Sequence, residues 1–350
     1  MTTIRVTSSH GVRSLCRQSP DGDGVWRGIR FVFDDATRPR DDQGADWLVA
    51  YDEPAAGCMT RVPVARRILF ITEPPSIKRY PSDYLARFGT VVSPFSQPGY
   101  AGRLVRQQAG LGWFYGADIG GAAPAGVSGP LGWSDLVAVN QDAWPRRGLI
   151  SAVCSAKTMN LNHVRRLRFL RMLKDALGDE LVVFGRGFAP IADKAEGIDG
   201  FRYHLVLENS LEDNGWTEKL ADPILAGVFP IVAGAPNLAR DFDPAGFALI
   251  DTRRPRAAVR AVRKLLADDP ASRAGPAMAA NKRRLMEHHN FFAICARLLD
   301  DPERAGAPLH PEPVPLPRSK RRSRLRRAFR VPGLVRNPMR RLYLKVMERN

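Results

Sequence analysis

The chain has 350 residues, of which 44% are hydrophobic and 25% are charged, and its formal net charge is +17 at pH 7. This length allows two domains of ordinary size, each with its own core, and the hydrophobic content argues against a disordered chain. There is no run of about 18 or more apolar residues and no apolar stretch of a signal peptide, so we expect a cytoplasmic protein without a membrane-spanning helix.

The first half of the chain has the pattern of an open α/β sheet. Apolar runs predict three strands, at residues 29–33, 47–51 and 68–71. Each strand ends in polar or acidic residues, as expected at the sheet edge where α/β proteins bind ligands. Glu73, after the third strand, is well placed there to accept a proton; the alternative is that it only caps the turn before Pro74.

A cluster of chain-breaking residues at 145–148 predicts a boundary between a first domain, 1–147, and a second domain, 148–305. A strand is predicted directly after this boundary, at 149–153. A strongly basic helix follows at 163–173, with apolar residues at helical spacing on one face.

Residues 203–236 hold more residues suited to ligand binding than any other part of the chain. An apolar strand ends at Leu207, and a polar loop then leads into a predicted helix with Thr217 as its N-cap and Gly227 at its end. Pro223 should kink this helix. A second apolar strand follows, so the unit is β-α-β and should bind its ligand at the carboxyl ends of the strands.

The charges of this unit indicate the ligand. A helix N-terminus offers unpaired N–H groups and partial positive charge, and Lys219 in the first turn adds a full charge, which suits a phosphate or diphosphate. Glu208 and Glu218 would repel a phosphate and are better suited to accept hydrogen bonds from hydroxyl groups. Phosphate and hydroxyls together describe a nucleotide sugar. The alternative is that these side chains are solvated surface charges.

The string E-N-S, a short loop, T-E-K-L and then A-G-x-x-P-I-V-x-G, which begins at Glu208, resembles the donor-binding signature of glycosyltransferase family 10, the α-1,3/1,4-fucosyltransferases. The resemblance implies an α/β protein of the GT-B type, with two Rossmann-like domains that face a cleft. It also implies GDP-fucose as the donor and inversion at the transferred carbon. The family often has an aromatic residue two positions before the threonine, where this chain has Gly215, with Trp216 beside it.

The resemblance further implies roles for single residues. In the family, an arginine three residues before an aromatic residue and seven before a leucine contacts the donor diphosphate. Arg166 keeps these intervals, although Arg165 is an alternative in so basic a helix. A glutamate after the corresponding strand is a candidate for the catalytic base, and Glu73 resembles it. The expected donor-binding residues are Arg166, Glu208, Asn209, Ser210, Thr217, Glu218 and Lys219.

The aromatic, glycine-rich loop 110–116 could stack its rings on sugar faces, although such clusters are more often core. We take 110–134 as the acceptor-side surface. No convincing metal-binding DxD motif is present, the four cysteines form no metal-ligand spacing, and the family resemblance supports a transferase that needs neither metal nor cofactor.

Most of the positive charge belongs to the end of the chain. Residues 318–350 hold 13 Lys or Arg and one acid, a net charge of +12, which leaves +5 for the remainder. Residues 306–350 are predicted as a Pro-rich linker and a basic amphipathic tail, which several bacterial members of the family also carry. We expect this tail to attach the protein peripherally to the anionic inner face of a bacterial plasma membrane. Nucleic-acid binding or a merely solvated tail are the alternatives.

The sequence therefore favours an inverting glycosyltransferase that moves fucose from GDP-fucose to a hydroxyl of a glycan acceptor, such as lipopolysaccharide or another surface glycan. One alternative is a transferase that uses another nucleotide sugar. The other is a non-catalytic protein that binds anionic surfaces and has a degenerate donor site.

Overall fold

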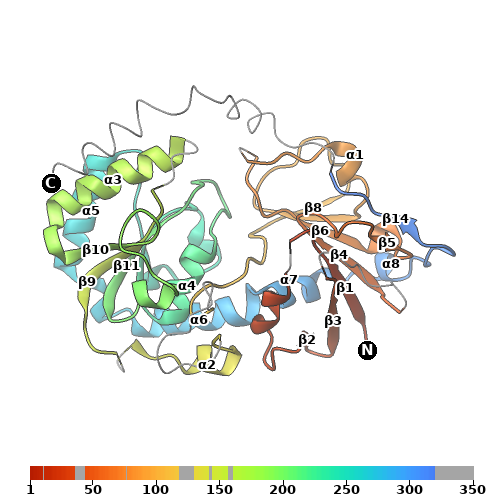
Figure 1. Ribbon diagram of the computed structural model, residues 1–350, viewed down its shortest axis with the longest axis horizontal. Helices are drawn as coiled ribbons and strands as arrows, with labels where there is room; N and C mark the ends of the chain where they lie inside the picture. The colour runs from red at the N-terminus through yellow and green to blue at the C-terminus, as the bar shows by residue number, and fades with distance from the viewer. Residues whose placement is uncertain are drawn as a thin grey trace.

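The computed structural model describes residues 1–10, 12–35, 44–75, 77–117, 130–141, 144–156 and 161–319. The described chain forms two lobes, each built on a sheet of mostly parallel strands with helices packed against it (Figure 1). The tail from Lys320 onward and residues 118–129 of the predicted acceptor-side surface lie outside the described residues.

The first lobe contains a seven-stranded sheet with the order β2-β3-β1-β4-β6-β7-β8. All neighbouring strands are parallel except β2 and β3. The three strands predicted in this half correspond to β3, β4 and β6. The strands are β1 (Thr3–Thr7), β2 (Val25–Trp26), β3 (Ile29–Phe33), β4 (Trp47–Tyr51), β6 (Arg67–Phe70), β7 (Thr90–Ser93) and β8 (Arg103–Arg106).

Strand β1 lies inside this sheet, between β3 and β4, but its sequence pattern is weak. The charged Arg5 interrupts its apolar residues. The structure buries this arginine to 2% exposure and pairs it with Asp34 at 3.0 Å. A buried charge that is paired and hydrogen-bonded can occupy a central strand, so the apolar pattern alone misses the element.

The side chains of the first sheet alternate between two cores. Val49 and Phe70 face a core that includes helix α7 (Phe291–Leu298) and the 3-10 helix η1 (Arg13–Gln18). Their neighbours Leu48 and Leu69 face the opposite core, which includes residues of helix α1 (Ser82–Leu85). Because both faces are covered, this parallel sheet is buried on both sides.

The second lobe contains a five-stranded parallel sheet with the order β10-β9-β11-β12-β13. The strands are β9 (Gly148–Val153), β10 (Leu181–Phe184), β11 (Phe201–Leu207), β12 (Phe229–Ala233) and β13 (Ala248–Leu249). The helices of this lobe are α2 (Trp133–Ala138), α3 (Leu161–Leu177), α4 (Glu218–Ala226), α5 (Pro255–Asp268) and α6 (Gly275–His288).

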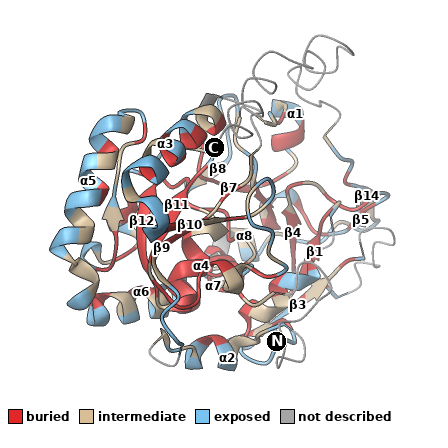
Figure 2. Cartoon of the chain, turned by 60° about the vertical axis from the view of Figure 1, so that its left-hand side comes forward, coloured by how far each residue is buried: buried red, intermediate tan, exposed pale blue. Residues whose placement is uncertain are grey.

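The helices of the second lobe cover both faces of its sheet. Leu205 and Ile231 face α3 and α5, whereas Val206 and Val232 face α4 and α6. Figure 2 shows the strands of this sheet largely buried and the outer faces of α3 and α5 exposed. The predicted β-α-β unit is β11, α4 and β12, in which β11 and β12 pair in parallel.

The chain crosses back from the second lobe to the first after α6. Helices α6 and α7 are separated by Asn290, whose side chain accepts the N–H of Ala293 and caps α7. Phe291 and Phe292 of α7 pack in the core of the first sheet. The range 148–305, predicted as the second domain, therefore includes a helix that packs on the other lobe.

The predicted Pro-rich spacer also joins the first lobe. Strand β14 (Val314–Pro315) pairs antiparallel with β5 (Met59–Thr60), and Leu316 is 1% exposed. Within the described residues, no helix is both long enough and apolar enough to cross a membrane.

Replacement of Phe291 by alanine tests whether α7 is an integral part of the first lobe. The Phe291 side chain is fully buried and packs against Phe31, Tyr51 and Phe70. We expect Phe291→Ala to lower the free energy of unfolding by about 3–5 kcal/mol in urea titrations, because the cavity would not fill. The control Leu309→Ala, at a residue 48% exposed, should change it by less than about 0.5 kcal/mol. Equal effects of the two changes would contradict this packing.

Candidate functional site

The candidate site is built around the start of helix α4, which begins directly after Thr217. The Thr217 hydroxyl accepts the Lys219 N–H at 3.3 Å, so Thr217 is the N-cap that the sequence predicts. The helix ends at Ala226, and Gly227 follows with a φ of 74°, a left-handed conformation that glycine adopts without strain. Strand β11 and helix α4 thus place their functional residues at one end of the second sheet.

Glu208, the first residue after β11, is 3% exposed and anchors the helix start. Its Oε1 accepts the backbone N–H of Thr217 at 2.7 Å, and the Thr217 hydroxyl lies 2.8 Å from Oε2. Burial raises the pKa of Glu208, whereas Lys219 and the bonds from Thr217 favour its charged form. The strand end and the helix start are therefore held as one unit across the loop between them.

Lys219 lies between the two glutamates that the sequence predicts for this site. Its Nζ is 2.9 Å from Oε1 of Glu218 and 3.7 Å from Oε2 of Glu208. Burial alone would raise the pKa of Glu218, but the nearby Lys219 and Lys194 outweigh burial and lower this pKa to about 2. Both members of the Lys219–Glu218 pair are therefore charged at neutral pH.

Arg166 reaches the same site from helix α3. It is 6% exposed; one terminal nitrogen donates to Oδ1 of Asn209 at 2.8 Å and the other to the carbonyl of Ser155 at 3.1 Å. Its Nε is buried and has no hydrogen-bond partner within the described part of the chain. The pKa of Lys219 is raised, because Glu218 and Glu208 outweigh the effect of burial, and the positive charge of Arg166 acts against this rise. The two cations therefore lie within electrostatic reach of each other.

Three further predicted residues have the following places. Arg165, the alternative to Arg166, is exposed and its guanidinium lies 3.3 Å from the side chain of Asn162. Asn209 is exposed, although its Oδ1 accepts a hydrogen bond from Arg166. Ser210 beside it is half-buried. Of the two arginines, Arg166 is the one that contacts the loop after β11.

Two charged residues of the site were not predicted from the sequence. Lys194, at the start of the 3-10 helix η5 (Lys194–Gly197), places its Nζ 2.7 Å from Oδ2 of Asp222 and 3.8 Å from Oε1 of Glu218. Asp222 is 1% exposed. Its position four residues after Glu218 on α4 was a usable signal, since such pairs share a helix face.

The first lobe approaches the site through the aromatic loop. Trp113 and Tyr115 are buried, as is usual for such clusters, whereas Phe114 is 36% exposed. Oδ1 of Asp222 accepts the backbone N–H groups of Phe114 and Tyr115 at 2.8 and 3.0 Å. Tyr51 at the end of β4 is close enough to Glu218 for that carboxylate to contribute, after burial, to raising the tyrosine pKa.

Glu73 lies on the loop that follows β6, at the carboxyl edge of the first sheet, and its side chain is exposed. At the same edge, Asp52 and Glu53 follow β4 and each lies 2.9 Å from Nζ of Lys78. The carboxyl edge of the first sheet therefore carries several carboxylates, as the strand endings predict.

Trp216, which neighbours the departure from the family pattern at Gly215, faces the protein interior. It is 4% exposed, its Nε1 donates to Oδ2 of Asp241 at 2.6 Å, and its ring packs edge-on against Phe242. Trp216 therefore does not present its ring as an exposed stacking surface.

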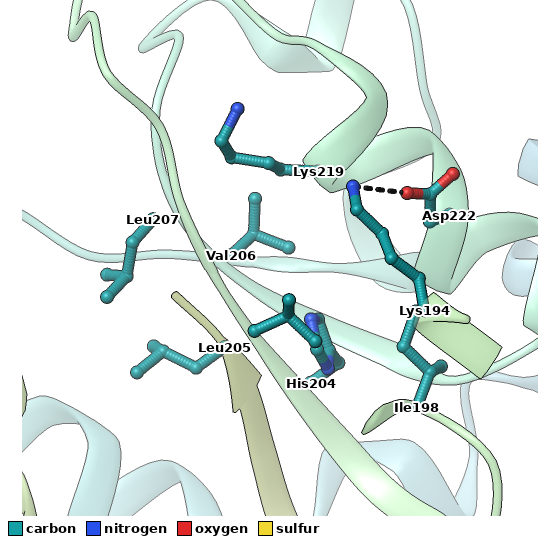
Figure 3. Close-up of a pocket in the computed structure, with 9 residues that line it drawn as sticks. Lys194, Ile198, His204, Leu205, Val206, Leu207, Lys219 and Asp222 are labelled. Carbon is teal, nitrogen blue, oxygen red and sulfur yellow. Dashed lines mark hydrogen bonds and ion pairs between the residues drawn. The ribbon is translucent and has the colours of Figure 1, made fainter. Parts of the chain in front are cut away.

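A small cavity of about 10 Å³ lies beneath Lys219 and Lys194, with room for about one water molecule (Figure 3). His204 of β11 lines it, is 3% exposed, and bonds through Nδ1 to the Ser151 hydroxyl at 2.8 Å. Burial, followed by the charge of Lys194, lowers the pKa of His204 to about 3. This histidine is therefore neutral at physiological pH and packs as part of the interior.

The arrangement is suited to hold an anion next to hydroxyl groups. Arg166, Lys219 and the N-terminus of α4 supply positive charge, and Glu218 supplies carboxylate oxygens beside it. Across the described ranges, no group of three or more His, Cys, Asp or Glu side chains is placed to hold a metal ion.

Comparison with solved structures finds glycosyltransferases. A crystal structure of α1,3-fucosyltransferase with GDP-fucose aligns over 89% of this chain and 93% of its own, with 16% identity and a TM-score of 0.50. Another α1,3-fucosyltransferase crystal structure aligns over 90% of this chain and 92% of its own, with 17% identity and a TM-score of 0.48. Sucrose-phosphate synthase from Thermosynechococcus elongatus aligns over 85% of this chain and 97% of its own, with 12% identity and a TM-score of 0.43. No protein-family model and no curated protein matches the chain.

The fold is GT-B. Two lobes with parallel sheets, each with helices on both faces, agree with the similarity to the GDP-fucose complex and with the fold predicted from the sequence. At 16% identity, this similarity concerns the fold.

The buried His204 makes stability depend on pH in a defined direction. Its pKa is about 3 in the folded protein against an ordinary value of 6.5, so the unfolded chain binds the proton first and stability falls as pH drops below 6.5. The expected slope from this group is about 1.4 kcal/mol per pH unit. Urea unfolding at pH 7 and pH 5 should show a smaller loss for Ser151→Ala/His204→Leu than for wild type. An equal loss in both would show that His204 does not titrate on unfolding.

Proposed function

We propose that this protein is a glycosyltransferase that binds a nucleotide sugar, most simply GDP-fucose, at the start of α4. The observation that carries the proposal is the placement of two cations beside the end of β11: Lys219 lies in the first turn of α4, and Arg166 donates to Asn209 with its Nε buried and unpartnered among the described residues. A diphosphate would supply acceptors for both cations and would lie at the positive end of the helix dipole.

In the proposed reaction, the oxygen of an acceptor hydroxyl attacks C1 of the donor sugar. The bond from C1 to the diphosphate oxygen breaks, and the nucleoside diphosphate leaves with the electron pair. Lys219 and Arg166 stabilise the negative charge that develops on it. Glu73, at the carboxyl edge of the first sheet, takes the proton of the acceptor hydroxyl, and attack from the opposite face inverts the configuration.

The remaining predicted residues shape the donor site. Glu218, with its low pKa of about 2, accepts hydrogen bonds from donor hydroxyls as a carboxylate. Glu208 holds Thr217, and Asn209 holds Arg166, so both act mainly by positioning other residues. Ser210 lies next to Asn209 at the same edge of the sheet.

A second candidate is a transferase with another nucleotide sugar as donor. The feature that favours it is the buried Trp216 ring beside Gly215, because neither residue offers an exposed ring for the nucleoside. Turnover of a panel of GDP-, UDP- and dTDP-sugars, measured as release of the nucleoside diphosphate, separates the two candidates. Release from GDP-fucose alone would support the first.

Calorimetry with GDP tests the diphosphate contact. We expect Lys219→Ala to weaken GDP binding by roughly ten- to hundredfold, because it removes a charge-assisted hydrogen bond. The control Lys264→Ala removes an equal charge from an exposed residue on α5 that pairs with Asp268, and it should bind GDP as wild type does. Absence of GDP binding by the wild-type protein would eliminate GDP-fucose as the donor, and absence of UDP and dTDP binding as well would leave the non-catalytic alternative.

We also propose that the basic end of the chain attaches the enzyme to an anionic membrane surface, where its acceptor glycan is made. The described chain ends at Ser319 on the first lobe, where Arg318 donates to the Pro54 carbonyl at 3.0 Å. Residues 320–350 hold 12 of the 13 basic residues of the tail. At about 1 kcal/mol per basic residue near an anionic leaflet, part of this charge suffices for attachment.

Deletion of residues 320–350 should abolish sedimentation with phosphatidylglycerol vesicles and leave GDP affinity unchanged, because the donor residues lie in the second lobe. Vesicles of phosphatidylcholine alone are the control and should bind neither protein. Retained binding to anionic vesicles after the deletion would refute the role of the tail.

A further inference from the structure

Lys194 occupies the donor site although no part of the resemblance assigns it a role. Its Nζ lies between two carboxylates of α4, 2.7 Å from Asp222 and 3.8 Å from Glu218, and its side chain is 17% exposed. Figure 3 shows Lys194 and Lys219 extending from different elements on either side of the start of α4. Together they form a series of alternating charges: Glu208, Lys219, Glu218, Lys194 and Asp222.

The position of Lys194 is fixed from several directions. Asp222 is 1% exposed, so its carboxylate requires a buried counter-charge, which Lys194 supplies. The other oxygen of Asp222 is occupied by the N–H groups of Phe114 and Tyr115. The Lys194 ammonium also lies 5.0 Å from the centre of the Phe114 ring. Lys194 is therefore preorganised and loses little side-chain entropy when a ligand binds.

Glu218 depends on both lysines, but a donor would compete for only one of them. In the proposed complex Lys219 faces the diphosphate, whose charge draws the ammonium group away from Glu218. Lys194 keeps its contacts, because its main partner is the buried Asp222 rather than the ligand. Without a neighbouring cation, the half-buried Glu218 would lose the charge that makes it a strong acceptor.

We propose that Lys194 is a positioning residue of the donor site: it keeps the Glu218 carboxylate ionised and directed at the hydroxyl groups of a nucleoside-diphosphate sugar while Lys219 is engaged by the diphosphate. This inference rests on the proposed function. It assigns hydroxyl recognition to a pair, Lys194 and Glu218, and diphosphate recognition to another pair, Lys219 and Arg166.

The test uses the full chain and the variant Lys194→Met/Asp222→Asn. This pair of changes removes one positive and one negative charge, so the net charge of the site is unchanged. The asparagine carbonyl still accepts the N–H groups of Phe114 and Tyr115, which avoids an unpaired buried charge. The control is Lys264→Met/Asp268→Asn, which removes an equal pair of charges from the exposed face of α5 and leaves Lys194 beside Glu218. If the double variant does not fold, Lys194→Gln, which can still donate to Asp222, takes its place.

Calorimetry is carried out with GDP-fucose and, as a probe without hydroxyls, with inorganic pyrophosphate. We expect the double variant to bind GDP-fucose roughly tenfold more weakly than wild type at pH 7, and pyrophosphate within about twofold. From pH 7 to pH 5 its affinity for GDP-fucose should fall further relative to wild type, because loss of Lys194 raises the pKa of Glu218 and more of this carboxyl is protonated. Lys264→Met/Asp268→Asn should follow wild type at both pH values.

A Glu218→Gln background gives a second readout. There the double variant should cause no further loss of GDP-fucose affinity, because the carboxylate on which Lys194 acts is absent. Equal losses for GDP-fucose and pyrophosphate, an unchanged pH dependence, or full additivity with Glu218→Gln would each overturn the role of Lys194. If wild type binds neither GDP-fucose nor GDP, the proposed donor itself is wrong, which is a separate result.

Discussion

The buried carboxylate of Glu208 is the constraint on which the start of α4, the proposed donor site, depends. It lies at the end of a central strand with 3% exposure, where a charge is costly unless it is hydrogen-bonded and paired. Thr217 supplies both of its donors and Lys219 the nearby positive charge, so the loop after β11 has to close back onto the strand. The same closure makes Thr217 the N-cap and thereby sets the first residue of α4.

The charge series continues from this point to the other lobe. Lys194 and Asp222 continue the series of charges along α4. Asp222 is its last member and accepts the backbone N–H groups of Phe114 and Tyr115. Arg17 of the first lobe holds the same segment by donating to the carbonyls of Trp113 and Tyr115. The segment between the lobes is therefore bonded from both sides, which connects the geometry of the donor residues to the first sheet.

Features that depend on short-range rules could be predicted from the sequence, whereas those that depend on distant partners could not. Thr217 as N-cap and Gly227 as terminator follow from the chemistry of a few adjacent residues. The pairing of Lys194 with Asp222 joins residues 28 positions apart. Strand β1 likewise depends on Asp34, which is the buried partner of Arg5. The return of helix α7 to the first lobe likewise depends on a distant partner, the apolar face of the first sheet.

Arg166 differs from Arg165 in that it is buried, and burial of a charged side chain costs free energy of folding. Arg166, Phe169, Leu170 and Leu173 are all buried and follow the spacing of one helix face, so Arg166 occupies a position of the core stripe. An arginine there loses its hydration, and the described structure offers acceptors to its terminal nitrogens but none to its Nε. In a medium of low polarity, such a group gains more from an anion than a solvated arginine such as Arg165 would. The buried placement that weakens the core is therefore also the one that supports Arg166, rather than Arg165, in the proposed contact with a diphosphate.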